Sequence, residues 1–223
     1  MDPSPAPSAV VVTGGTGYLG VPLVGSLLAR GHRVRVLCRA AATRRVPVGA
    51  EAVVGDALDP ADVARALSEG STLVHLVGTP HPSPAKAAEF ERVDLASIHA
   101  SVQAAVARRV RQLVYVSVAH PAPVMRAYVD ARVAGESAIT ASPLAATILR
   151  PWYVLGPGHR WPLAFVPVAR LLEALPWTRE TARRLGLVTR DQMMAALVGA
   201  VESPPAPGTR RVLDVAAIRS AAD

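Results

Sequence analysis

Short apolar runs alternate with helical patterns along most of the chain. The runs are rich in β-branched side chains and bounded by turn residues, as is typical of strands buried on both faces of a sheet. These predicted strands lie at 9–13, 33–38, 50–56, 72–78, 112–118 and 146–151. Because strand and helix alternate regularly, the order predicts an α/β fold, a doubly wound parallel sheet of the Rossmann type.

Helical patterns fill the gaps between the predicted strands. One follows the first strand and ends at Gly31, and another begins with Asp59 as its N-cap and Pro60 at its first position. Longer patterns cover about 85–109 and 124–141. Helices in these connections can cover both faces of a parallel sheet.

The alternation changes after residue 151. A loop is followed by helical patterns at 163–175 and 189–202 and by a strand-like run at 210–215. The predicted organisation is a disordered tail at 1–8, a Rossmann core at 9–151 and, completing the same domain, a small substrate-side portion with a helical cap at 152–223.

The apolar stretch at 160–177 is the least expected part of this organisation. Its aliphatic and aromatic residues at helical spacing are typical of a core helix or a dimer face, so a homodimer is one expectation. The alternatives are a lid over an apolar substrate and a helix lying on a membrane surface. Arg170, Glu173 and the prolines of this stretch argue against insertion across a bilayer.

Composition excludes several classes of protein. The 223 residues suffice for one α/β domain with a full core, but not for two large ones. Mean hydropathy is +0.29, yet no apolar run reaches the roughly 18 residues that a membrane span needs. The first residues lack the basic and apolar regions of a signal peptide, and Cys38 is the single cysteine, so we expect a cytoplasmic protein without a disulfide or a thiolate metal site.

The net charge of +7 raises the question of nucleic-acid binding. The basic residues are scattered, however, and Lys86 is the only lysine among the 24 basic side chains. No zinc-finger or helix-turn-helix pattern accompanies them. We therefore expect neither a nucleic-acid partner nor a metal site, and a small molecule as the substrate.

A glycine-rich turn, "TGGTGYLG" at 13–20, separates the first predicted strand from the first helix. Glycines permit a tight turn and a close approach of the backbone to a pyrophosphate, whose charge the helix start attracts. Two registers are possible, because Gly14 and Gly15 each combine with Gly17 and Gly20 into a nucleotide-binding pattern. The context of strand, turn and helix predicts dinucleotide binding in either register.

The end of the second strand indicates which dinucleotide is bound. An acidic residue there would bind the adenosine ribose and favour NAD, but this chain has Cys38 and Arg39, with Arg44 and Arg45 just after. A guanidinium fits a 2′-phosphate, so Arg39 favours NADP(H) over NAD(H). Residues at the ends of the next two strands are expected to line the same crevice: Asp56, Ala57, Val77, Gly78 and Thr79.

Several segments together resemble the short-chain dehydrogenase/reductase superfamily, in its extended and atypical branches. The matching segments are "TGGTGYLG" at 13–20, "GDALD" at 55–59, "FERVDLASIHASVQAA" at 90–105, "LVYVSV" at 113–118, "AYVDARVAGE" at 127–136 and "ATILRPWYVLGPG" at 146–158. Members similar to NmrA and to sugar epimerases and dehydratases are nearest in pattern. The resemblance implies Gly14, Gly17 and Gly20 as the three family glycines, and these residues as cofactor contacts: Gly14, Thr16, Gly17, Tyr18, Leu19, Gly20, Arg150 and Pro151.

The resemblance also implies a catalytic apparatus. The family pairs a tyrosine, which donates or accepts the substrate proton, with a lysine one helical turn later, and a serine orients the substrate oxygen. Ser117 and Tyr128 match these positions, but Arg132 stands where the family has lysine. A cation at this spacing should still lower the pKa of a phenol, although arginine and lysine are not interchangeable beside a ribose.

Three functions follow from these observations. The first is an NADP(H)-binding oxidoreductase that transfers hydride to or from a small carbonyl or alcohol, with Tyr128 as acid and base. The second is an NmrA-like sensor or assembly factor that binds the cofactor with little turnover, which Arg132 motivates. The third is an epimerase or dehydratase that retains NAD, although such members usually carry an acidic residue after the second strand.

Overall fold

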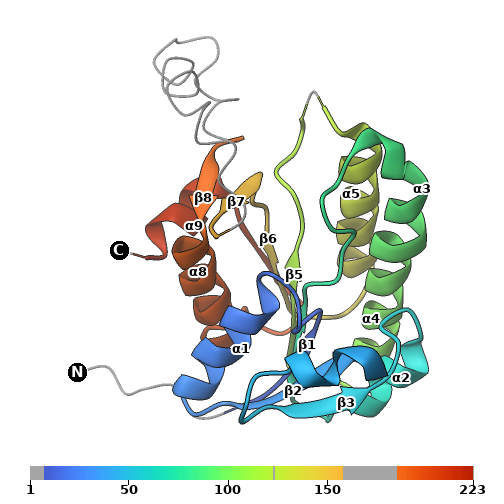
Figure 1. The fold of residues 1–223 in the computed structure, drawn as a ribbon, viewed down its shortest axis with the longest axis vertical. Helices are drawn as coiled ribbons and strands as arrows, with labels where there is room; N and C mark the ends of the chain where they lie inside the picture. Colours follow the sequence, from blue (N-terminus) through green and yellow to red (C-terminus); the bar gives the residue numbers. More distant parts are fainter. Residues whose placement is uncertain (1–7, 123, 158–184, 223) are drawn as a thin grey trace.

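The computed structural model of the protein describes residues 8–122, 124–157 and 185–222. Within these residues, seven parallel strands form one sheet in the order β3-β2-β1-β4-β5-β6-β9 (Figure 1). The strands are β1 Ala9–Thr13, β2 Arg33–Cys38, β3 Glu51–Val54, β4 Thr72–His75, β5 Gln112–Val116, β6 Ala146–Leu149 and β9 Arg210–Leu213. The order reverses between β1 and β4, which confirms the Rossmann-type prediction and places the switch point beside the glycine-rich turn.

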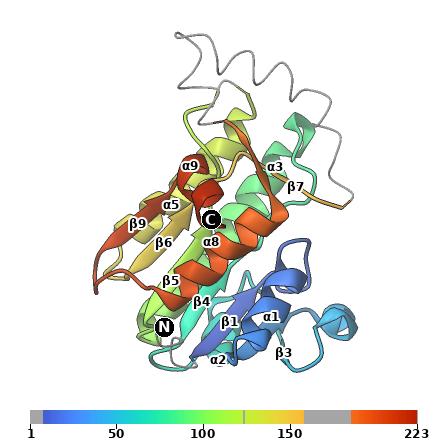
Figure 2. The same ribbon diagram turned by 90° about the vertical axis from the view of Figure 1, so that its left-hand side faces the viewer.

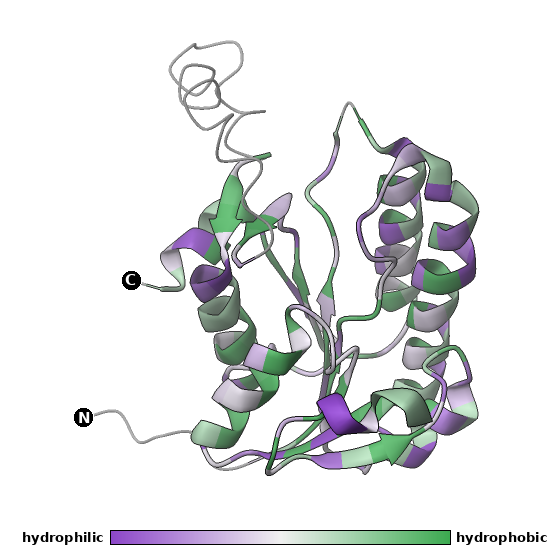
Figure 3. Cartoon of the chain, viewed as in Figure 1, coloured by the Kyte–Doolittle hydropathy of each residue, from purple (hydrophilic) through white to green (hydrophobic). Residues whose placement is uncertain are grey.

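Helices cover both faces of the sheet. On one face α1 packs beside α8, and on the other α2, α4 and α5 lie together (Figures 1 and 2). Their bounds are α1 Gly20–Ala29, α2 Pro60–Ala66, α4 Ala96–Ala107, α5 Arg126–Thr140 and α8 Arg190–Glu202. Successive strand residues point to opposite faces, so Val10 and Val12 join one buried cluster while Val11 joins the other. Figure 3 shows apolar and polar positions alternating along the helices of both layers.

The helix predicted over 85–109 is not continuous. A 3₁₀ turn (η2, Pro84–Lys86), a short helix (α3, Ala87–Glu89) and a π-helical turn (η3, Phe90–Leu95) precede α4. A π turn accommodates an extra residue and rotates the side chains that precede it. Phe90 and Asp94 in this turn are both buried.

The C-terminal part completes the sheet. Strand β9 pairs with β6, and the short helix α9 (Val215–Ser220) follows it. A two-stranded sheet of β7 (Tyr153–Leu155) and β8 (Leu187–Thr189) was not predicted from the sequence. The predicted tail, apart from Ser8, and the apolar stretch at 160–177 lie outside the described residues.

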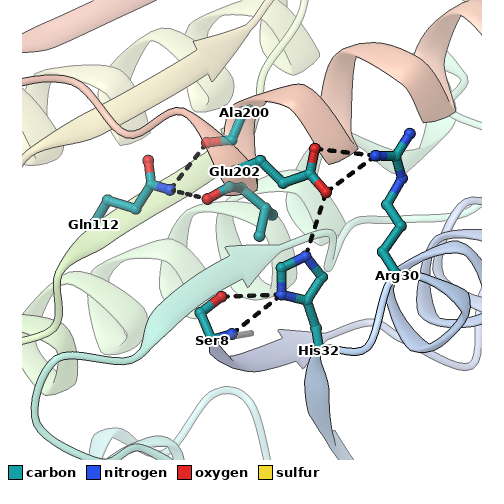
Figure 4. A network of polar contacts seen from close by, with 7 residues as sticks. Ser8, Arg30, His32, Gln112, Ala200 and Glu202 are labelled. Carbon is teal, nitrogen blue, oxygen red and sulfur yellow. Dashed lines mark hydrogen bonds and ion pairs between the residues drawn. The ribbon is translucent and has the colours of Figure 1, made fainter. Parts of the chain in front are cut away.

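Polar contacts fasten the C-terminal end of α8 to the sheet (Figure 4). The side-chain amide of Gln112, at the start of β5, donates to the carbonyls of Ala200 and Val201 at 2.9 and 3.1 Å. Glu202 pairs with Arg30 at 3.1 Å and with the His32 ring at 3.5 Å. Helix α8 is thus joined to β5 and, through Arg30 and His32, to elements from the start of the chain. Among the described residues, no helix is long and apolar enough to cross a membrane.

Candidate functional site

The glycine-rich turn leaves no room for side chains at its two ends. Gly14 has a φ of +75°, and a Cβ there would lie 2.8 Å from the backbone carbonyl carbon of Leu76, which directly follows β4. A Cβ on Gly20 would collide with the carbonyl oxygen of Gly14. Gly17 is exposed and donates its N–H to the Gly14 carbonyl at 3.0 Å. The backbone can therefore approach a pyrophosphate closely at the start of α1, so these residues fit a dinucleotide cofactor.

Two adjoining cavities lie along the carboxyl ends of the strands. The first, of about 480 Å³, lies beside the end of β2 and includes Arg39; we call it the Arg39 cavity. The second, of about 380 Å³, includes Tyr128; we call it the Tyr128 cavity. The residues common to both linings are Gly14, Gly17, Leu76, Gly78, Thr79 and Pro80. A ligand lying across the glycine-rich turn would reach into both, and their volumes are typical of small-molecule sites.

The Arg39 cavity contains most of the residues that the sequence predicted to bind a cofactor. Nine of them line it: Gly14, Thr16, Gly17, Arg39, Asp56, Ala57, Val77, Gly78 and Thr79. Arg45 lines it as well, beside Arg39, whereas Arg44 is exposed and is not part of the lining. Burial raises the pKa of the Cys38 thiol in this wall, against the opposing effect of Arg45.

The Tyr128 cavity joins the glycine-rich turn to the proposed catalytic residues. Ser117, Tyr128 and Arg132 line it together with these other sequence-predicted residues: Gly14, Gly17, Tyr18, Leu19, Gly20, Gly78, Thr79 and Pro151. Trp152, Tyr153 and Val154 add an apolar and aromatic wall that the sequence did not indicate. The Tyr128 ring stands edge-on to Phe90, with 5.2 Å between the ring centroids.

Arg132 lies directly behind Tyr128. Its guanidinium carbon is 5.3 Å from the centre of the Tyr128 ring and 5.9 Å from that of Tyr115, and Nη1 donates to the Val116 carbonyl at 3.0 Å. A Cβ on Gly78 would collide with Nη2, so glycine at this position makes room for the guanidinium. Burial alone would lower the pKa of Arg132, but Tyr128, Tyr115 and Asp94 outweigh it and raise that pKa, so the side chain is charged.

Asp94 is a site residue that the sequence reasoning missed. Its carboxylate pairs with Arg132 at 2.7 Å and accepts hydrogen bonds from the backbone N–H and hydroxyl of Thr79 at 2.9 and 2.6 Å. The residue lies in a segment that matched the family pattern, but only the π turn reveals that its side chain points inward. Asp94 thus connects the end of β4 with α5.

A second buried carboxylate, Glu136, contacts Ser117 in the lining of the Tyr128 cavity. It accepts the hydroxyl hydrogen of Ser117 at 2.5 Å and pairs with Arg150. The ring of His120 lies 3.4 Å from the same carboxylate. In the described part of the chain, Arg150 lines neither cavity, because its guanidinium turns toward Glu136, whereas its neighbour Pro151 does line the Tyr128 cavity. No signal in the sequence paired Glu136 with these residues, which meet only through the fold.

The side chains of these cavities define the chemistry that the site can offer. Across the described ranges, no group of three or more His, Cys, Asp or Glu side chains is arranged to hold a metal ion. The site offers a phenol beside a buried guanidinium, a serine hydroxyl and a glycine-rich turn suited to phosphates. These groups can bind a dinucleotide and exchange a proton with a small molecule.

Sequence comparisons agree with this arrangement. A family model described as NAD(P)H-binding matches residues 14–160. A ceramide reductase from Caulobacter vibrioides is 31% identical over 207 residues, which cover 89% of this chain and 62% of that protein. A 3-diazoavenalumate denitrifying reductase from a Streptomyces species is 32% identical over 232 residues, covering 92% of this chain and 75% of the relative. The chain therefore spans less than two thirds of the ceramide reductase's length.

Solved structures share the fold. A short-chain dehydrogenase/reductase superfamily protein from Agrobacterium tumefaciens with bound NAD superposes with a TM-score of 0.67 at 20% identity, over 95% of this chain and 81% of the other. A UDP-N-acetylglucosamine 4-epimerase from Bacillus cereus gives a TM-score of 0.68 at 19% identity, over 93% and 79% of the two chains. These likenesses concern the fold, whereas the match of the family model over residues 14–160 shows that the protein belongs to the NAD(P)H-binding family.

Proposed function

We propose that the protein is an NADP(H)-dependent oxidoreductase that transfers hydride to or from a small carbonyl or alcohol, with Tyr128 as acid and base. The observation that carries this proposal is the continuity of the two cavities. Gly14, Gly17 and Gly78 line both, so the glycine-rich turn and Tyr128 face one connected space. The two curated relatives named above are both reductases, which favours reduction as the direction.

The preference for NADP(H) rests on the arginines of the Arg39 cavity. Arg39 and Arg45 both line it, and the end of β2 carries Cys38 rather than an acidic residue. Guanidinium groups bind phosphate oxygens through paired hydrogen bonds, whereas a carboxylate at this place would repel a 2′-phosphate. Arg39 and Arg45 are therefore the proposed ligands of that phosphate.

The proposed mechanism assigns proton transfer to Tyr128. When bound, the cofactor would supply a hydride to the carbonyl carbon, and the Tyr128 hydroxyl would give its proton to the carbonyl oxygen, so that an alcohol forms. Arg132 stabilises the resulting phenolate because its guanidinium lies against the ring. Ser117 gives its own hydrogen to Glu136, so in this arrangement Tyr128 is the residue that donates to the carbonyl oxygen.

The substitution Tyr128→Phe tests this assignment. We expect turnover of NADPH with a panel of aldehydes and ketones to fall roughly 10²- to 10⁴-fold, the usual contribution of a general acid. Affinity for NADPH, measured by calorimetry, should stay within about twofold, because the ring is retained and its contact with Phe90 is apolar. The comparison variant Tyr153→Phe, which removes another phenol from the same cavity, should lose far less turnover. If Tyr128→Phe is as active as the parent, the assigned role is wrong.

A second candidate function is a cofactor-binding sensor with little turnover. The observation that favours it is that Arg132, which stands where the family has lysine, is already engaged by Asp94, by the Val116 carbonyl and by two aromatic rings. Calorimetry that finds submillimolar NADPH affinity, together with no turnover across the carbonyl panel, would support the sensor. Rapid oxidation of NADPH by any panel member would contradict it.

A further inference from the structure

We propose that Asp94 is a positioning residue that neutralises Arg132 in the wall of the Tyr128 cavity and thereby lets this cavity bind the oxidised, positively charged nicotinamide as well as the reduced one. The inference rests on the proposed function in one respect, since it takes NADP(H) as the ligand. It concerns binding of the two redox forms and does not depend on turnover.

The Asp94 carboxylate is buried and is fixed in position by contacts with Arg132 and Thr79. Its side chain is fully shielded from solvent, and one oxygen lies 2.7 Å from the Arg132 guanidinium. The other oxygen accepts two hydrogen bonds from Thr79, which itself lines both cavities. Two hydrogen bonds and one ion pair thus fix the position of the carboxylate, and with it the position of the cation.

Arg132 has no alternative position within its surroundings. Its guanidinium is confined between the Tyr115 and Tyr128 rings, hydrogen-bonded to the Val116 carbonyl and pressed against Gly78. Because the side chain is only 7% exposed, solvent screens its charge weakly. Without Asp94, the cavity would face a fixed positive charge that solvent screens only in part.

The wall of the Tyr128 cavity is otherwise without net charge. Among the described lining residues, Arg132 is the only one with a permanent charge. The other ion pair behind the lining, Glu136 with Arg150, is internally neutral as well. The net charge of this wall is therefore zero with Asp94 in place and +1 without it.

The change in the net charge of the wall affects the binding of only one redox form of the cofactor. The oxidised nicotinamide ring carries a positive charge and the reduced ring carries none, while the rest of the cofactor is the same in both. A wall with a charge of +1 would repel the oxidised ring and leave the reduced ring nearly unaffected. The ratio of the dissociation constants of NADP⁺ and NADPH isolates this effect, because contacts made by the remainder of the cofactor cancel.

The test is calorimetric titration of NADP⁺ and NADPH into the full chain and its variants. We expect Asp94→Asn to raise the ratio of the NADP⁺ dissociation constant to that of NADPH roughly fivefold, the size expected for one unit charge in a partly screened site. The double substitution Asp94→Asn with Arg132→Gln removes both charges and should return the ratio to the parent value. Glu69→Gln, which breaks the exposed pair with Arg109 at the opposite end of β4, should leave the ratio unchanged.

Because Asp94→Asn leaves a buried cation without its partner, the variant could fail to fold. Asp94→Ser is the second single variant, since the smaller side chain leaves room for a water molecule beside the guanidinium. A ratio within twofold of the parent's in the folded single variants overturns the proposal, and so does a ratio that stays raised in the double variant. Tight binding with a shifted ratio but no turnover would refute the oxidoreductase assignment and leave the role of Asp94 intact.

Discussion

His75 shows how a single buried residue makes the stability of this fold depend on pH. The imidazole is completely shielded and contacts the hydroxyls of Thr13, Ser97 and Ser101 at 3.0, 3.3 and 2.9 Å. Burial, assisted by Arg132, lowers the pKa of His75 to about 3. The ring is therefore neutral in the folded protein, whereas it is protonated below about pH 6.5 in the unfolded chain.

This shift gives a signed prediction for acid stability. The contribution of the neutral His75 to the free energy of unfolding is fully present above pH 6.5. It is lost as the pH falls toward 3, by up to about 1.4 kcal/mol per pH unit. The test is urea unfolding of the parent and of His75→Gln between pH 3.5 and 7.5, roughly the window that the two pKa values set. It compares how the free energy of unfolding of each protein depends on pH. We expect a shallower pH dependence in the variant, and equal slopes for both proteins would contradict the prediction.

The arginines after β2 offer a second prediction at the residue scale. Arg39→Ala and Arg45→Ala should each weaken NADPH binding roughly tenfold, because each removes a charged hydrogen-bond donor from the cavity, and should change NADH binding little. Arg44→Ala is the matched control, since Arg44 is an exposed neighbour that does not line the cavity. Calorimetry measures the affinity of the parent and of each variant for both cofactors, and parallel losses for NADPH and NADH would show that neither arginine recognises the 2′-phosphate.

At the scale of elements, the strands were predictable and the segments between them less so. Strands buried on both faces are continuously apolar, so their positions and their parallel order could be inferred from the chain. The π turn at Phe90–Leu95 could not, because its residues also fit an ordinary helix and only tertiary packing selects the rotated register. The small β7–β8 sheet was missed since three-residue strands carry too little pattern.

The same distinction applies to the candidate site. Gly14, Arg39 and Tyr128 were found because each follows a strand or begins a helix in a recognisable local pattern. Asp94 and Glu136 were missed because their roles depend on partners from other elements: Arg132 on α5 for Asp94, and Ser117 after β5 for Glu136. Local pattern thus predicts which groups face the cavities, while the charges that hold those groups become visible only in the folded molecule.

At the scale of the whole molecule, the C-terminal portion shares its core with the nucleotide-binding half. Met193, Leu197 and Val201 of α8 belong to the same buried cluster as Val12 and Leu23. Because a shared core couples the two regions energetically, we expect them to unfold in one transition. The three tryptophans, Trp152, Trp161 and Trp177, all lie in the C-terminal third, so their fluorescence reports on that part alone, whereas far-ultraviolet circular dichroism reports on the whole sheet.

Leu197→Ala tests this coupling. The side chain is fully buried between α8 and the sheet, so its truncation should cost about 2–5 kcal/mol of unfolding free energy. Both spectroscopic signals should shift together to a lower urea midpoint. Val106→Ala, which shortens a side chain 38% exposed on α4, should shift the midpoint much less. If Leu197→Ala moves the fluorescence transition and leaves the dichroism transition in place, α8 and the residues around it form a unit that unfolds separately from the nucleotide-binding core.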